Sequence, residues 1–121
     1  MTIQILAVDD SRTMRSMIQS TLAEAGITTH LAEDGVQGLE VLEGLEPDAI
    51  ITDINMPNLD GFGFIDGVRA QDKHKTTPIL VLTTESAPEL KARARASGAT
   101  GWVVKPFDPE KLVRALKMIA G

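Results

Sequence analysis

Residues 3–10 read IQILAVDD, a short apolar run that ends in two aspartates. The run is too short for a helix, and it is mostly apolar on both faces, as a strand covered by helices on both sides must be. Similar runs rich in Ile, Val and Leu occur at residues 49–51, 79–82 and 102–104, and a weaker one occurs at residues 27–32. We therefore expect five strands of the kind found in buried parallel sheets.

Amphipathic segments separate these runs and predict helices. The first runs from Met14 to Leu22, with apolar residues at steps of three and four, and Gly26 is a suitable stop. The second has an apolar stripe from Val36 to Leu45, and the Glu-Pro-Asp segment at residues 46–48 ends it.

Three further helices are expected. One, over residues 62–69, is weakened by nearby glycines. Another opens with Ser86-Ala87-Pro88-Glu89, which has the form of a capping box with proline in the first turn, and it stops at Gly98. The last has Asp108 as its N-cap and Pro109 at its first position. Strand and helix thus alternate five times, which predicts an α/β fold with a parallel sheet and right-handed crossovers.

The composition excludes several classes of protein. The chain has 121 residues and no cysteine, which removes thiolate metal sites, thiol nucleophiles and disulfide scaffolds and fits a reducing compartment. A net charge of −5 and the absence of tyrosine argue against nucleic-acid binding. No apolar run approaches the ~20 residues of a membrane span, and residues 1–4 lack the basic start of a signal peptide. We expect a cytoplasmic protein that binds neither nucleic acid nor membranes.

Polar residues follow the expected strands at their carboxyl ends, where open parallel sheets bind ligands. These residues are Asp9, Asp10, Asp53, Thr83 and Lys105. Each has an ordinary alternative, since a single aspartate at such a turn is most often an N-cap, and the threonine and lysine could be a strand end and a solvated loop residue. Three carboxylates at one edge nevertheless repel one another unless a cation joins them. Oxygen ligands of this kind predict a Mg²⁺ site.

The other groups at this edge indicate phosphoryl chemistry. Lys105 and the hydroxyl of Thr83 are donors of the kind that hold phosphoryl oxygens. Asp53 can be the nucleophile that takes up a phosphoryl group as an acyl phosphate. The chain has no Walker loop and no glycine-rich nucleotide motif, so we do not expect ATP as the direct donor. His30 and His74 lie away from the carboxylates and are expected to be ordinary surface residues.

Five segments in order carry a family resemblance: VDDSRTMR at residues 8–15, DG at 34–35, DINMPNLDG at 53–61, LTTE at 82–85 and GWVVKPF at 101–107. Together they resemble the receiver domain of two-component response regulators, and within that family the stand-alone chemotaxis proteins of the CheY type. The resemblance implies a flavodoxin-like (βα)5 doubly wound sandwich with strand order 2-1-3-4-5. It also implies that residues 1–121 form one receiver domain with no output domain.

The resemblance implies roles for the aspartates. Asp53 would accept phosphate from a histidine kinase. Asp9, Asp10 and Asp53, with the backbone carbonyl of Asn55, would bind Mg²⁺. The protein would then be a phospho-acceptor rather than an enzyme, with self-phosphorylation from small donors and autodephosphorylation as its intrinsic reactions.

The resemblance also implies a switch. Thr83 and Lys105 would contact the phosphoryl group, and the peptide bond between Lys105 and the proline after it would be cis. In the family the threonine moves inward on phosphorylation, and an aromatic residue on the last strand rotates to follow. Trp102 holds that position here, with a plain core tryptophan as the alternative. Asn55 and Glu85 hold positions that influence the lifetime of the acyl phosphate, and this pair resembles chemotaxis proteins with short-lived signals.

The partners implied are a CheA-like phosphotransfer domain of a histidine kinase, a phosphatase and a downstream target, with the protein itself a monomer. In the family the target docks on the fourth helix, fifth strand and fifth helix. Residues 1–90 carry 5 Lys/Arg and 15 Asp/Glu (−10), whereas residues 91–121 carry 7 and 2 (+5). These late cations are explained either as solvated helix faces or as a surface for an acidic peptide, such as one from the flagellar motor switch. Six of them lie on the two helices: Lys91, Arg93, Arg95, Lys111, Arg114 and Lys117.

Other functions share parts of this pattern. A phosphate sink or phosphorelay intermediate would use the same chemistry without a motor target. A phosphatase of the haloacid dehalogenase type also uses an aspartyl nucleophile and Mg²⁺, but it has a general-acid aspartate two residues later, where this chain has Asn55. A flavodoxin-like FMN carrier is disfavoured because carboxylates at the end of the first strand would repel its phosphate.

Overall fold

Five strands form one parallel sheet in the computed structural model, which describes residues 2–120. The strand order is β2-β1-β3-β4-β5, so the expected flavodoxin-like order is confirmed. Met1 and Gly121, the two ends of the expected domain 1–121, lie outside the described residues. The strands are β1 (Gln4–Val8), β2 (Thr28–Ala32), β3 (Ala49–Thr52), β4 (Ile79–Thr83) and β5 (Gly101–Val104).

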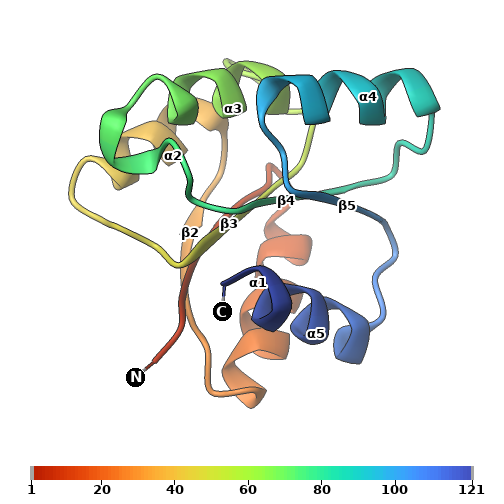
Figure 1. Cartoon of the computed structure of the whole chain (residues 1–121). Coiled ribbons are helices and arrows are strands. Elements are labelled where there is room, and N and C mark those ends of the chain that lie inside the picture. Colours follow the sequence, from red (N-terminus) through yellow and green to blue (C-terminus); the bar gives the residue numbers. More distant parts are fainter. Residues whose placement is uncertain (1, 121) are drawn as a thin grey trace.

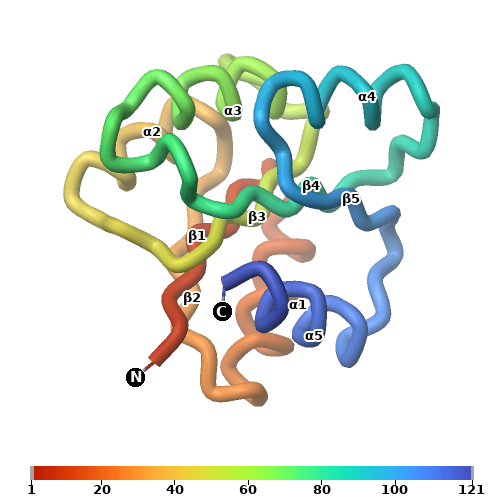
Figure 2. Tube along the Cα trace, viewed as in Figure 1, coloured from red at the N-terminus to blue at the C-terminus, as the bar shows by residue number. Residues whose placement is uncertain are grey.

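Helices cover both faces of this sheet. Figure 1 shows α1 and α5 together on one face and α2, α3 and α4 on the other. The tube in Figure 2, followed from red to blue, passes alternately through a strand and a helix. None of the described helices is long and apolar enough to cross a membrane. The helices are α1 (Arg12–Glu24), α2 (Gly35–Leu42), α3 (Gly61–Arg69), α4 (Pro88–Ser97) and α5 (Pro109–Ala120), with a short 3₁₀ turn, η1 (Asp72–His74).

Apart from β2, which reads TTHLA, the strands are mostly apolar on both faces because they contribute to two separate cores. In β1, Leu6 and Val8 pack with Phe64 of α3 in the core beneath α2, α3 and α4. The alternate residues, Ile5 and Ala7, pack in the second core with α1 and α5. All five side chains are completely buried. Burial of one large apolar side chain stabilises the fold by about 1.5–3 kcal/mol, so both layers contribute to folding.

Short polar side chains begin most of the helices. Ser11, Asp34 and Asp60 each accept a hydrogen bond from the backbone N–H three residues later. Asp108 does the same at α5, accepting from the second and third residues after it at 3.0 and 3.3 Å, as predicted. Gly98 follows the end of α4 with φ 114°, a left-handed conformation that glycine adopts without strain. These caps satisfy backbone groups that a helix leaves free at its ends.

Two predicted helix ends were wrong. The second helix ends at Leu42, so Leu45 lies beyond it, and Val36 from the expected apolar stripe is 44% exposed. The two residues after α2 bond to carbonyls three positions back, a tight turn that ends the helix early. At α4 the N-cap is Ala87 without a side-chain bond, so the capping box expected to begin at Ser86 does not form.

His74 is not the surface residue that the sequence predicted. It is completely buried, because η1 turns its ring under the end of α2. Its Nε2 lies 3.3 Å from the carbonyl oxygen of Leu42, and its Nδ1 lies 3.4 Å from the hydroxyl of Thr77. Arg69 donates at 2.7 Å to the His74 carbonyl and at 2.7 Å to that of Gly98. His74 and Arg69 therefore connect the end of α2, the end of α3 and the residue after α4.

The Asp34 carboxylate makes a contribution to stability that depends on pH. One carboxylate oxygen accepts from the N–H of Gln37 and the other from the side chain of Asn58, both at 2.8 Å. These two donors hold the pKa of Asp34 below its ordinary value. A carboxylate with a lowered folded-state pKa stabilises the fold above its unfolded-state pKa of about 3.9 and loses that contribution as the pH falls through the folded-state value.

We predict that Asp34→Ala lowers the free energy of unfolding by about 1–2 kcal/mol at neutral pH. The difference from wild type should shrink as the pH falls below about 4, because Asp34 then becomes protonated. Urea denaturation across this pH range measures both effects. Asp34→Asn is the matched control, since asparagine caps helices equally well but does not titrate. A difference between wild type and Asp34→Ala that is the same at pH 3 and pH 7 would contradict the prediction.

Candidate functional site

The parallel register brings the expected site residues to one edge of the sheet. Val8 of β1 lies beside Thr52 of β3, so the residues that follow them, Asp9 and Asp53, leave the sheet side by side. The N–H of Asp53 donates to the carbonyl of Val8 at 3.0 Å, which continues the ladder to the site. Lys105 follows β5, and its N–H donates to the carbonyl of Thr83 at 2.7 Å. The strand-end rule thus places these residues correctly.

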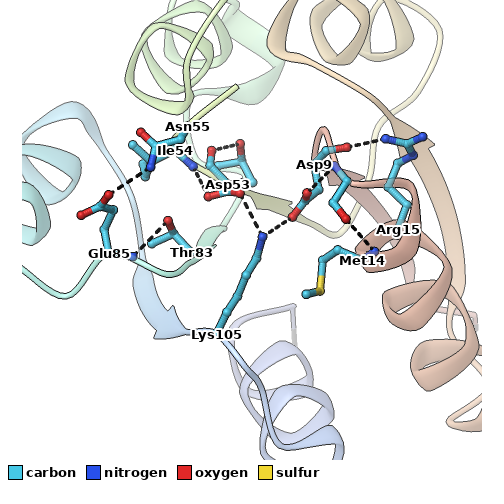
Figure 3. Close-up of polar contacts among 11 residues, drawn as sticks. Asp9, Met14, Arg15, Asp53, Ile54, Asn55, Thr83, Glu85 and Lys105 are labelled. Carbon is cyan, nitrogen blue, oxygen red and sulfur yellow. Dashed lines mark hydrogen bonds and ion pairs between the residues drawn. The ribbon is translucent and has the colours of Figure 1, made fainter. Parts of the chain in front are cut away.

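Lys105 connects two almost buried carboxylates (Figure 3). Its Nζ lies 2.7 Å from an oxygen of Asp9 and 2.9 Å from an oxygen of Asp53, whose residues are 1% and 8% exposed. Burial alone would lower the pKa of Lys105, but the two carboxylates raise it overall, so the ammonium stays charged. Burial raises the pKa of Asp9 above its ordinary value, although Lys105 and the N–H of Ser11 favour its charged form. The peptide bond from Lys105 to Pro106 is cis, as expected.

The three aspartates form one oxygen-lined cluster that fits a hard cation. Carboxylate oxygens of Asp9, Asp10 and Asp53 lie within 4.8 Å of one another. Asp9 and Asp53 are buried, whereas Asp10 is exposed, so the cluster opens to solvent on one side. Lys105 supplies one positive charge against three negative ones. An all-oxygen donor set with an uncompensated negative charge is the chemistry that favours Mg²⁺ over softer metals.

The loop after Asp53 approaches α3 very closely. Asp53 accepts the N–H of Ile54 at 2.6 Å on one oxygen, and the carbonyl of Ile54 accepts the N–H of Gly61 at 2.8 Å. A Cβ on Gly61 would lie 2.8 Å from the Cα of Ile54 and closer still to the Asp53 carbonyl. Glycine at the start of α3, which weakens the helix in isolation, is therefore required by the site.

Glu85 contacts three other residues of the site. Its side chain accepts from the amide of Asn55 at 3.1 Å, and its N–H lies 3.4 Å from the hydroxyl oxygen of Thr83. Its carbonyl accepts from the indole N–H of Trp102 at 3.0 Å. Thr83 is completely buried, whereas Trp102 is only partly buried. The structure thus places all four sequence-predicted residues in one connected network, but their shared dependence on Glu85 was not apparent from spacing.

Arg15 makes a contact with the site that the sequence did not predict. It is the last residue of the VDDSRTMR segment at residues 8–15, where no role was assigned to it, and its Nη1 donates at 2.7 Å to the backbone carbonyl of Asp9 (Figure 3). The alternation of polar and apolar residues cannot reveal this contact, because its acceptor is a backbone atom. The sequence signals are its place in the VDDSRTMR segment and its position one turn into the helix that directly follows the aspartates.

The basic residues noted in the sequence are all exposed on α4 and α5, which lie on opposite faces of the sheet beside β5 (Figure 1). On α4, the guanidinium of Arg93 lies over the ring of Phe62, 4.0 Å from its centre. Such a contact between a cation and an aromatic face holds the side chain in place while its charge remains exposed. The residues in this set, which we name the basic face, are Lys91, Arg93, Arg95, Lys111, Arg114 and Lys117.

Comparison with known proteins gives consistent matches over nearly the whole chain. The family model for the response regulator receiver domain matches residues 5–117. The chemotaxis protein CheY1 of Helicobacter pylori is 38% identical over 120 residues, which cover 98% of this chain and 97% of that protein. The sensor histidine kinase CheAY of the same species is also 38% identical, over 115 residues, and there the match spans only 14% of the longer protein.

Solved structures agree in fold. The chemotaxis protein CheY4 of Vibrio cholerae has a TM-score of 0.95 and 46% identity, covering 98% of this chain and 99% of that one. The receiver domain of the sensor histidine kinase PA1611 of Pseudomonas aeruginosa has a TM-score of 0.92 and 29% identity, covering 100% and 99%, and is described with a magnesium ion in its active-site cleft. With its sheet order, its acidic cluster and these matches, the chain belongs to the response regulator receiver domain family, and its relatives include chemotaxis proteins of the CheY type.

Proposed function

We propose that this chain is a phosphorylation-controlled chemotaxis switch in which Asp53 accepts a phosphoryl group from a histidine kinase of the CheA type. The observation that carries the proposal is the position of Asp53, an 8% exposed carboxylate bonded to Lys105 within a cluster of three aspartates. One oxygen of Asp53 forms a bond to phosphorus as the bond from phosphorus to the donor histidine nitrogen breaks. The electron pair of the broken bond stays on the imidazole.

Asp9, Asp10 and Asp53, with the backbone carbonyl of Asn55, are the proposed ligands of Mg²⁺. The bound ion would supply positive charge against the phosphoryl oxygens, which otherwise meet three carboxylates. Lys105 supplies a second positive charge, and its raised pKa keeps it protonated when the phosphoryl group arrives. Its ammonium can then exchange its bond to Asp53 for one to a phosphoryl oxygen.

Thr83 and Trp102 are the proposed switch residues, and Glu85 connects them. A phosphoryl group on Asp53 offers a new acceptor for the buried hydroxyl of Thr83. Movement of Thr83 toward it would break the 3.4 Å contact with the N–H of Glu85. The same residue's carbonyl accepts from the indole of Trp102, so a shift in this loop reaches β5 directly. Phosphorylation would thereby shift a two-state equilibrium between loop positions.

Fluorescence of Trp102, the only tryptophan in the chain, tests the central proposal. Addition of beryllofluoride in the presence of Mg²⁺ should change the emission, because the indole N–H is hydrogen-bonded to the carbonyl of Glu85, in the loop that is proposed to move. Asp53→Asn should abolish the response. Asp60→Asn is a matched control, since it makes the same change at an exposed helix cap that asparagine serves equally well. A silent wild-type protein, or a response that survives Asp53→Asn, would overturn the proposal.

The acyl phosphate is proposed to be short-lived. The Asn55 and Glu85 side chains hydrogen-bond to each other, and Asn55 is exposed. We propose that these polar groups line the route by which water reaches the phosphorus. We predict that the phosphorylated wild-type protein in Mg²⁺ decays within seconds, on the timescale of chemotaxis. Asn55→Leu and Glu85→Leu should each prolong it several-fold, because leucine neither bonds to water nor leaves the route open.

The lifetime is measured by loss of label after phosphorylation with acetyl phosphate. Ser86→Leu is the control, since Ser86 is exposed on the same loop and has no part in the Asn55–Glu85 contact. A wild-type phosphorylated form that is stable for hours in Mg²⁺ would refute the prediction.

The basic face is the proposed docking surface for an acidic target peptide, with the flagellar motor switch as the proposed target. Opposite charges across an interface strengthen association and set its specificity. In the beryllofluoride form, reversal of both Lys91 and Lys117 to Glu should weaken binding of an acidic peptide by about tenfold or more. Reversal of Lys73 and Lys75 is the matched control, because it makes the same charge change at two exposed residues, one in η1 and one directly after it.

Fluorescence anisotropy of a labelled acidic peptide measures the affinity. Equal weakening by both double reversals would show only a general effect of net charge. Unchanged binding after reversal of Lys91 and Lys117 would exclude this surface. If no acidic peptide binds while phosphate still transfers to Asp53, the protein acts instead as a phosphate sink or relay intermediate.

A further inference from the structure

The turn between β1 and α1 is held from both directions at Asp9. Its N–H donates at 3.1 Å to the carbonyl of Ala32 in β2, and its carboxylate accepts from the N–H of Ser11 at 2.9 Å. Its carbonyl accepts from Arg15 at 2.7 Å. The first two contacts use backbone groups of β2 and of the turn itself. The third comes from a long side chain one turn into α1, which the proposed phosphoryl chemistry does not use.

We propose that Arg15 is a positioning residue that sets the place of the Asp10 carboxylate for metal binding, an inference that rests on the proposed Mg²⁺ site. The carbonyl of Asp9 and the N–H of Asp10 belong to one planar peptide unit. A hydrogen bond that fixes the carbonyl therefore fixes the direction in which the Asp10 backbone leaves the strand.

Asp10 needs this support more than its two neighbours in the cluster. Asp9 and Asp53 are buried and are both held by Lys105. Asp10 is exposed, and it takes part in none of the ion pairs found among residues 2–120. Its carboxylate nevertheless lies within 4.8 Å of the other two. Its position thus depends on its backbone, which Arg15 anchors.

Electrostatics alone predicts an effect of the opposite sign. A cationic side chain near a metal site repels the metal, so removal of the charge of Arg15 should tighten Mg²⁺ binding if charge were its only influence. Loss of a positioning contact should weaken it instead. Arg12 provides the comparison, since it lies one turn earlier on the same helix, carries the same charge and is exposed.

The test is a titration of the full chain with MgCl₂, followed by Trp102 fluorescence and by isothermal calorimetry. Arg15→Ala should raise the dissociation constant for Mg²⁺ about tenfold, within the range seen when a contact that orients a metal ligand is lost. Arg15→Lys, which keeps a long cationic donor, should recover part of the affinity. Arg12→Ala should leave binding unchanged or slightly tighter.

Urea unfolding with and without Mg²⁺ separates positioning from a general loss of stability. A structural role alone would lower the free energy of unfolding equally in both conditions, whereas the positioning role reduces the extra stability that Mg²⁺ provides. Unchanged or tighter binding in Arg15→Ala, or equal weakening in Arg12→Ala, would overturn the inference while leaving the Mg²⁺ site intact. A wild-type protein that binds no Mg²⁺ would instead overturn the proposed function, and this inference with it.

Discussion

One ammonium group, that of Lys105, lies between two nearly buried carboxylates that end different strands. The bonds join the end of β5 to the ends of β1 and β3, so the site depends on these three strands ending at the same edge of the sheet. Removal of either partner would leave a poorly solvated charge, which is far more costly than an exposed one. The pairing is also incomplete, since three carboxylates face one cation. This imbalance makes the edge of the sheet attractive to a divalent cation and then, with Lys105, to a phosphoryl group.

In the proposed switch, a change at the acidic cluster would reach Trp102 through the backbone groups of Glu85 rather than through a chain of side chains. The N–H and the carbonyl of Glu85 contact Thr83 and Trp102 respectively, and they belong to peptide units on either side of one residue. A small displacement of the loop therefore alters both contacts together. The Glu85 side chain meanwhile bonds to Asn55 beside Asp53. The same residue thus belongs to the proposed lifetime control and to the proposed switch, so a substitution there should affect both properties.

The parts of the fold that the sequence predicts well are those set by local pattern. Apolar runs, with a weaker one at residues 27–32, identify the strands to within one residue, because helical layers cover both faces of the sheet. The strand-end rule gathers Asp9, Asp53 and Lys105 without knowledge of any distance. Contacts to backbone atoms are different. The bond from Arg15 to the Asp9 carbonyl and the burial of His74 under α2 depend on how separate elements pack, and neither leaves a periodic signal. The early end of α2 at Leu42 has the same origin, since helical spacing continues to Leu45 while the chain already turns.

The charge asymmetry along the chain acquires a spatial meaning through β5. The acidic cluster lies at the ends of β1 and β3, whereas the basic face lies on the two helices that flank β5. Strand β5 borders both, because Lys105 at its end reaches the carboxylates and Trp102 within it contacts the loop before α4. If acidic and basic side chains were mixed over one surface, each ligand would meet charges of both signs and would be bound less specifically. Their separation on either side of β5 would keep a cation and a phosphoryl group at the acidic cluster and the proposed acidic peptide on the basic face.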